Sequence, residues 1–128
     1  DTVTLSAPLG GGKSVLARAI VRRFVPREEV PGPTFTLVQT YQTQNFTISH
    51  VDLYRVKSES ELRELGLDEA LERGVLVIEW PDRMALQLAP DRLDIMFEAA
   101  DGESRLMKLV GRGSWVARLK SLRLPGAE

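Results

Sequence analysis

The sequence contains no cysteine, and this absence excludes several chemistries at once. Its 128 residues offer no disulfide bond, no thiol nucleophile and no cysteine ligand for zinc. Because disulfide-free chains are typical of reducing compartments, we expect the protein to be cytoplasmic.

Long apolar runs are missing as well. The longest, residues 74–78, is far shorter than the ~20 residues that cross a bilayer, so the sequence predicts no membrane segment. Net charge is also small, and a formal charge of −1 gives no reason to expect bulk attraction to nucleic acid. Residues 59–72 nevertheless carry six acids and one base, whereas residues 104–126 carry six bases and no acid. We interpret both stretches as solvated faces, with a docking surface as the alternative.

The length of the chain fits one domain. With 43% hydrophobic residues it can bury a real core, but it is too short for two. We therefore expect residues 1–128 to form a single domain. Because the chain starts at Asp1 without methionine and enters a strand at once, we also expect an N-terminal segment to be missing.

A phosphate-binding loop is the first motif along the chain. Leu9-Gly-Gly-Gly-Lys-Ser14 lies between a short apolar strand and a helical pattern that opens at Val15. In such a loop the glycine N–H groups surround phosphate oxygens, the lysine supplies positive charge and the hydroxyl binds Mg²⁺. The predicted nucleotide-binding residues are Leu9, Gly10, Gly11, Gly12, Lys13, Ser14 and Val15. Ala7 stands where the motif has its first glycine, so we expect weak nucleotide affinity.

The remaining patterns predict an α/β fold. We expect a mixed sheet that carries flanking helices and β-hairpins. Ser58 and Glu61 form a capping-box pattern, Gly66 is expected to end that helix, and Ser114 is expected to cap the last one. The expected strands are residues 3–5, 36–41, 46–52, 75–79, 93–98 and 104–110, and the expected helical segments are residues 15–24, 58–65, 68–71 and one that starts at residue 114.

Two carboxylates close strand-like runs. Asp52 ends residues 48–52 and Glu79 ends residues 75–79. If both strands lie near the strand before the phosphate loop, the carboxylates emerge at one edge of the sheet. There they can hold the hydration shell of Mg²⁺ and orient the attacking oxygen, so we predict catalytic and metal-binding roles for both, with Ser14 as a further metal ligand. The alternative for each is an ordinary capping or salt-bridging role.

Two further residues lie beside these carboxylates in the sequence. His50, the only histidine, shares the strand face of Asp52. Since phosphoryl transfer relies chiefly on positioning and charge, we place His50 behind the groups that touch substrate, rather than as a general base. Trp80 either packs in the core or lies near enough to the nucleotide to sense it.

Five segments stand in a specific order over about residues 3–110. They are Leu9-Gly-Gly-Gly-Lys-Ser14, Pro33-Thr-Phe-Thr-Leu37, His50-Val-Asp-Leu-Tyr-Arg55, Glu61-Leu-Arg-Glu-Leu-Gly66 and Ile78-Glu-Trp-Pro-Asp82. Together they resemble the TsaE family, also called YjeE, the bacterial ATPase of tRNA threonylcarbamoyladenosine synthesis. The resemblance implies that the fold is a small three-layer P-loop NTPase domain. It also implies a weak, partner-stimulated ATPase that uses ATP and Mg²⁺.

The resemblance also implies roles for residues and partners. Residues 33–37 would form a nucleotide-responsive switch loop containing Thr34 and Thr36, and Trp80 would lie near the site. The partners would be TsaD-like and TsaB-like proteins, whose complex is reset by ATP hydrolysis, and tRNA would be contacted only indirectly or through that complex. Transfer of the threonylcarbamoyl group would belong to the TsaD-like protein.

Two alternative functions stay open, and the sequence departs from the family pattern at several positions. A nucleotide-dependent assembly module with negligible turnover and a small-molecule P-loop kinase fit the same loop. No Asn-Lys-x-Asp segment, a common guanine reader, is present, so ATP is favoured over GTP. Ala7 and Pro8 depart from the family's loop, and the basic C-terminal helix has no family signature, which leaves it open to partner or tRNA contact.

Overall fold

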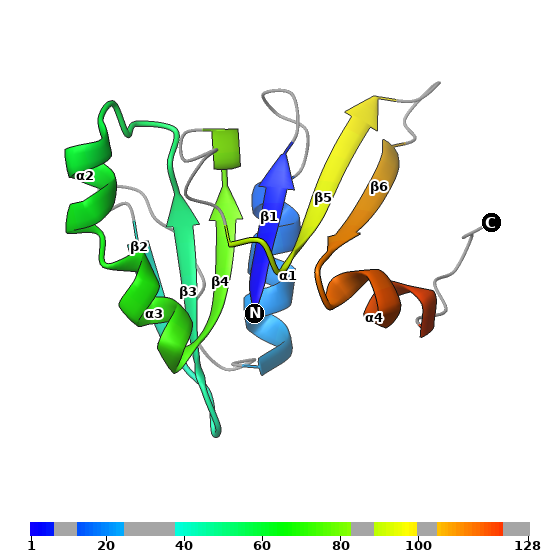
Figure 1. Ribbon diagram of the computed structural model, residues 1–128, viewed down its shortest axis with the longest axis horizontal. Helices are drawn as coiled ribbons and strands as arrows, with labels where there is room; N and C mark the ends of the chain where they lie inside the picture. Colours follow the sequence, from blue (N-terminus) through cyan, green and yellow to red (C-terminus); the bar gives the residue numbers. More distant parts are fainter. Residues whose placement is uncertain (7–12, 25–37, 83–88, 100–104, 122–128) are drawn as a thin grey trace.

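The protein is described by a computed structural model in which residues 1–6, 13–24, 38–82, 89–99 and 105–121 are placed (Figure 1). These residues form six strands and four helices. In chain order they are β1 (Thr2–Ser6), α1 (Lys13–Phe24), β2 (Val38–Gln42), β3 (Thr47–Asp52), α2 (Glu59–Glu64), α3 (Leu67–Arg73), β4 (Gly74–Glu79), β5 (Arg92–Ala99), β6 (Arg105–Arg112) and α4 (Trp115–Ser121).

The strands form one mixed sheet in the order β2-β3-β4-β1-β5-β6. The four inner strands are parallel, and each edge strand is antiparallel to its neighbour. The two edge pairs are the hairpins that the sequence predicted. The turn of the second hairpin, at Asp101-Gly102, lies outside the described residues.

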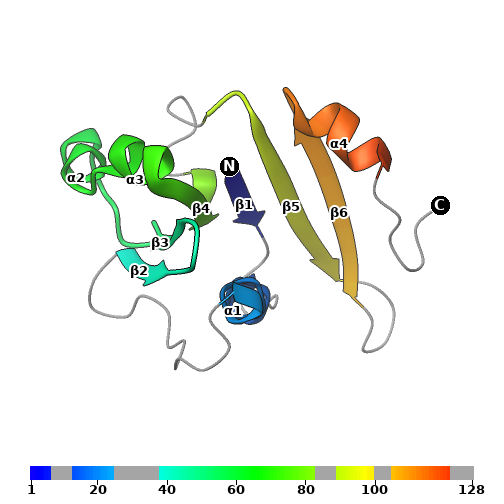
Figure 2. The same ribbon diagram turned by 90° about the horizontal axis from the view of Figure 1, so that it is seen from below.

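Helices cover both faces of the sheet and make three layers. Figure 2 shows α1 on one side of the strands, with α2 and α3 on the other. Each side has its own apolar cluster, and full burial of one such side chain contributes about 1.5–3 kcal/mol. The buried members are Leu5, Ala17, Val21, Tyr41, Ile48, Val77, Leu93 and Ile95 in the first cluster, and Val51, Leu53, Val56, Leu62, Leu67, Leu76 and Ile78 in the second. The predicted three-layer α/β fold is therefore confirmed.

The start of α2 follows the capping signal in the sequence. Ser58 Oγ accepts a hydrogen bond from the Glu61 N–H at 3.2 Å. The reciprocal bond differs from a standard capping box, because the Glu61 carboxylate accepts from the Lys57 N–H at 2.8 Å instead of from the cap residue. Gly66 has φ of 64° and separates α2 from α3, as its position predicted. The predicted helical turn at 68–71 was too short, since α3 extends over seven residues.

Ser114 directly precedes α4, and its carbonyl oxygen accepts a hydrogen bond from the Arg118 N–H at 3.2 Å, so it lies at the predicted cap position. The Ser114 N–H and hydroxyl both donate to Asp91 Oδ1, at 2.8 and 2.7 Å. The hydroxyl bond is the main reason why the pKa of Asp91 lies below its ordinary value. On α4 itself, the Arg118 guanidinium lies 3.6 Å from the centre of the Trp115 ring and pairs with Asp1 at 2.9 Å. One base of the predicted basic face is thus already engaged within the chain.

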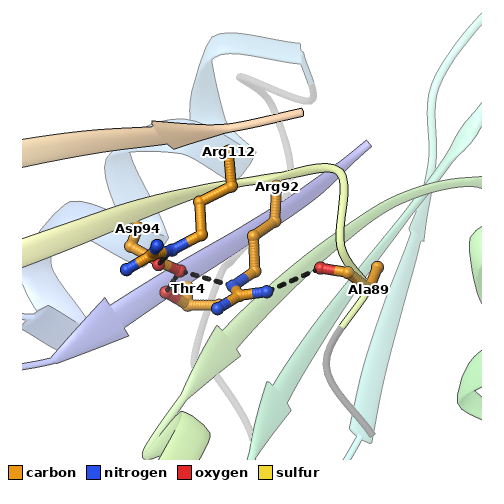
Figure 3. A network of polar contacts seen from close by, with 5 residues as sticks. All are labelled: Thr4, Ala89, Arg92, Asp94 and Arg112. Atoms are coloured by element: carbon orange, nitrogen blue, oxygen red, sulfur yellow. Dashed lines mark hydrogen bonds and ion pairs between the residues drawn. The ribbon is translucent and has the colours of Figure 1, made fainter. Parts of the chain in front are cut away.

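A network of side-chain hydrogen bonds and ion pairs links the β5–β6 hairpin to β1 (Figure 3). Thr4 Oγ and Arg92 Nε donate to Asp94 Oδ1 at 2.6 and 3.0 Å, and Arg112 Nε donates to Oδ2 at 2.9 Å. Arg92 also donates to the carbonyl oxygen of Ala89 at 2.8 Å. Burial alone would raise the pKa of Asp94, but these donors and the nearby guanidinium charges hold that pKa below its ordinary value.

Candidate nucleotide-binding site

The carboxyl ends of three parallel strands meet at one edge of the sheet. In the register, Leu5 on β1 lies opposite Glu79 on β4, and Glu79 lies opposite Asp52 on β3. The condition set by the sequence, that both carboxylate strands lie near the phosphate-loop strand, is therefore met. β1 ends one residue after Leu5, and α1 starts at Lys13.

The glycine-rich connection itself lies outside the described residues. This applies to the predicted nucleotide contacts at Leu9, Gly10, Gly11 and Gly12. The other three predicted contacts, Lys13, Ser14 and Val15, form the first turn of α1, as a phosphate-binding helix requires. The switch residues Thr34 and Thr36 are also outside the described part. The roles of all these residues stay predictions.

Glu79 is buried, and its carboxylate contacts the imidazole of His50. The imidazole Nε2 and the carboxylate Oε2 are 2.6 Å apart, and the two residues are 1% and 2% exposed. The contact links β3 to β4 and fixes an acidic group just where β4 ends. From the sequence, His50 was expected on the face of Asp52 but not as the partner of Glu79.

Asp52 has a different environment from Glu79. It is only half-buried, and its Oδ1 accepts a hydrogen bond from the Tyr54 N–H at 3.0 Å. This bond to the backbone two residues on is the pattern of an Asx turn, which aligns the carboxylate while leaving it close to solvent. The local capping role that was the alternative for Asp52 is therefore present, and it does not prevent the carboxylate from contacting a ligand as well.

Trp80 follows Glu79 in an unusual backbone conformation. Its φ is 62°, in the left-handed region that bulky residues rarely adopt. Its ring lies 4.8 Å from that of Tyr54, which is half-exposed. Residues held in such conformations cluster at functional sites. Sequence reasoning missed Tyr54 as part of this edge, although the segment His50-Val-Asp-Leu-Tyr-Arg55 contained it.

The donor set at this edge suits a hard cation. Asp52 and Glu79 supply carboxylate oxygens, a ligand type that Mg²⁺ takes together with water, and the hydroxyl of Ser14 stays a predicted further ligand. Among the described residues, no group of three or more acidic, histidine or cysteine residues is arranged to hold a metal ion alone. A metal at this edge would accordingly be shared with phosphate oxygens and water.

A cavity of about 270 Å³ lies near the same edge but on the other face of the sheet. Thr4 and Asp94 line it, whereas their strand neighbours Leu5 and Ile95 point into the α1 cluster. Neither Asp52 nor Glu79 lines this cavity.

Within the described part of the chain, no helix has the length and apolar character needed to cross a membrane.

Comparisons with known proteins agree with the motifs. A family profile described as "Threonylcarbamoyl adenosine biosynthesis protein TsaE" matches residues 1–107. The tRNA threonylcarbamoyladenosine biosynthesis protein TsaE of Rickettsia felis is 40% identical over 115 residues, covering 89% of this chain and 67% of that protein. Its namesake in Rickettsia conorii is 40% identical over 111 residues, covering 86% of this chain and 63% of that protein.

The fold has a match among solved structures as well. The crystal structure of YdiB from Bacillus subtilis superposes with a TM-score of 0.76 at 25% identity, covering 94% of this chain and 74% of that one. The chain spans about two thirds of the length of the Rickettsia felis and Rickettsia conorii proteins. The profile match over most of the chain confirms the resemblance found in its motifs, and the protein belongs to the TsaE family of threonylcarbamoyladenosine biosynthesis proteins.

Proposed function

We propose that the protein is a weak, partner-stimulated, Mg²⁺-dependent ATPase that supports formation of N6-threonylcarbamoyladenosine on tRNA. The observation that carries the proposal is the alignment of Asp52 and Glu79 at the carboxyl edge of adjacent strands. This edge adjoins β1, which leads through the glycine-rich segment to α1. A phosphate loop beside two carboxylates is the arrangement that phosphoryl transfer requires.

Different residues of the chain have different roles in this reaction. Lys13 and the first N–H groups of α1 supply positive charge to the phosphate oxygens. Ser14 and Asp52 offer oxygen ligands, and Glu79 orients the attacking water through its carboxylate. When bound, Mg²⁺ neutralises the charge that develops on the phosphate oxygens. Trp80 follows Glu79 and packs against the apolar cluster of α2 and α3, which is the packing role expected as one alternative, and nucleotide sensing by its indole stays a prediction.

The names of the relatives support the proposed pathway. The Rickettsia felis and Rickettsia conorii proteins are both named for tRNA threonylcarbamoyladenosine biosynthesis. We infer that this chain works in the cytoplasm with TsaD-like and TsaB-like proteins and meets tRNA through their complex. ATP hydrolysis resets that complex between rounds, while the TsaD-like protein transfers the threonylcarbamoyl group.

The test is tRNA modification in a reconstituted mixture of this protein, its TsaD-like and TsaB-like partners, ATP and tRNA. Lys13→Ala and Glu79→Ala should each abolish modification while circular dichroism shows an intact fold. Two matched controls remove the same charges elsewhere: Lys120→Ala on α4 and Glu98→Ala on β5, both exposed, should retain activity. Full activity in the first pair would reject the assignments.

Two other outcomes would redirect the proposal. Nucleotide-dependent binding to the partners that survives Glu79→Ala, with no turnover in the wild type, would favour an assembly module. Ala7 in the phosphate loop is the feature of the sequence that keeps this alternative open. Phosphate that appears on an added metabolite, instead of in solution, would favour a small-molecule kinase.

A further inference from the structure

His50 and Glu79 come together only through the sheet. They are 29 residues apart in the chain, on the neighbouring parallel strands β3 and β4. His50 lies opposite Val77, and Asp52 lies opposite Glu79, so the imidazole reaches along the neighbouring strand to the last residue of β4. Their side chains are 1% and 3% exposed, which leaves bulk water little access to the 2.6 Å contact.

The chemistry of the pair gives the bond a direction. An ionised carboxylate can only accept, so the hydrogen between the two groups belongs to His50 Nε2. The other ring nitrogen, Nδ1, is buried and has no hydrogen-bond partner among the described residues. With one nitrogen committed to Glu79 and the other buried, the ring is poorly placed to take a proton from substrate. Its effect must pass through the Glu79 carboxylate.

A packing role alone does not explain this pair. Replacing a buried ionic or polar pair with apolar residues is often neutral or stabilising, because removing charged groups from water is costly. The neighbouring inward residue of β3 is Ile48, and Val77 on β4 lies opposite His50, so an aliphatic side chain would suit the cluster beneath α1. We therefore explain the imidazole at this position by its hydrogen bond to the Glu79 carboxylate.

We propose that His50 is a positioning residue that fixes the orientation of the Glu79 carboxylate for hydrolysis. A hydrogen bond to Oε2 restricts rotation of the carboxylate about its last bond, so each molecule presents the same oxygen geometry to water and Mg²⁺. This inference rests on the proposed function, since it concerns the carboxylate assigned there to the attacking water. It adds the residue that holds that carboxylate in place.

Two substitutions separate this role from packing. In His50→Gln the amide nitrogen can occupy the place of Nε2, whereas in His50→Asn the shorter amide can occupy only the place of Nδ1. Both replace the ring with a small amide, so they are matched in polarity. The measurement is steady-state hydrolysis of Mg·ATP by the full chain in the presence of its TsaD-like and TsaB-like partners, with kcat and KM determined separately and folding checked by circular dichroism.

The expected result is a 10- to 100-fold lower kcat for His50→Asn, the range seen when groups behind metal ligands are lost, with KM little changed. His50→Gln should stay within about threefold of the wild-type kcat, because the donor to Glu79 is restored. Equal kcat values for both variants and the wild type, even with lowered melting temperatures, would overturn the proposal. Equal losses in both folded variants would overturn it too. Failure of the proposed function is recognised separately, because the wild type itself would then hydrolyse no ATP.

Discussion

Removal of the Asp94 carboxylate should lower the free energy of unfolding. The size of the loss can be worked out from the groups that contact this carboxylate. Asp94 is the common acceptor for the hydroxyl of Thr4 and for the guanidinium groups of Arg92 and Arg112. In Asp94→Ala these donors lose their acceptor together, and the two guanidinium groups lose the carboxylate that pairs with both. The β5–β6 hairpin also loses a side-chain link to β1, while the backbone pairing of β5 with β1 stays.

The size of the loss follows from burial. Thr4 is 1% exposed, and leaving a buried hydroxyl without a partner costs about 1–3 kcal/mol. The side chains of Arg92 and Arg112 are 18% and 52% exposed, so their ion pairs contribute only about 0.5–1 kcal/mol each. The free energy of unfolding should fall by about 3 kcal/mol in total, which corresponds to roughly 10 °C in melting temperature for a chain of this size.

The assay is urea and thermal unfolding followed by circular dichroism, with Arg112→Ala as the control. That variant removes only the most exposed donor and should cost at most about 1 kcal/mol. The pKa of folded Asp94 lies below its ordinary value, so its contribution is fully present above the unfolded pKa and is lost as pH falls through the folded one. The difference in free energy of unfolding between wild type and Asp94→Ala should therefore shrink below about pH 4. Equal stabilities of wild type and Asp94→Ala at pH 7, or a difference that does not shrink in acid, would refute this reasoning.

Three further substitutions test the backbone and the caps, all measured by urea unfolding. Gly74→Ala should cost about 3 kcal/mol, because the new Cβ would lie 2.1 Å from the carbonyl oxygen of Thr47 on the paired strand. Gly66→Ala should cost only about 1–2 kcal/mol, since its φ is positive but the space around it is open; a larger loss than at Gly74 would contradict the geometry. Ser58→Ala should cost about 1 kcal/mol by removing the cap of α2, and no change would show that this cap does not stabilise the helix.

Features with a local cause could be predicted from the sequence. The capping pattern at Ser58, the break at Gly66 and the apolar run that ends at Glu79 each depend on residues only a few positions apart. These signals placed the helices and strands and identified two strand-end carboxylates. The family motifs then gave the P-loop type of fold, which the match to a solved structure supports.

Features that depend on the order and register of strands could not be predicted. The pairing of His50 with Glu79 requires β3 and β4 to be neighbours in one specific register, and periodicity does not reveal that. The hydrogen bonds that Ser114 donates to Asp91 span 23 residues, so a serine at a helix start could not reveal them. The positive φ of Trp80 had no signal either, because such positions are usually marked by glycine.

The most direct test of the central claim is ATP hydrolysis by the purified protein with Mg²⁺, alone and after addition of the TsaD-like and TsaB-like partners with tRNA. We predict slow turnover alone, clear stimulation by the complex, and loss of stimulated turnover in Glu79→Ala with nucleotide binding retained. A Glu79→Ala variant that is stimulated as strongly as the wild type would contradict the assignment of this carboxylate. A wild-type protein that hydrolyses no ATP with its partners present would contradict the ATPase itself.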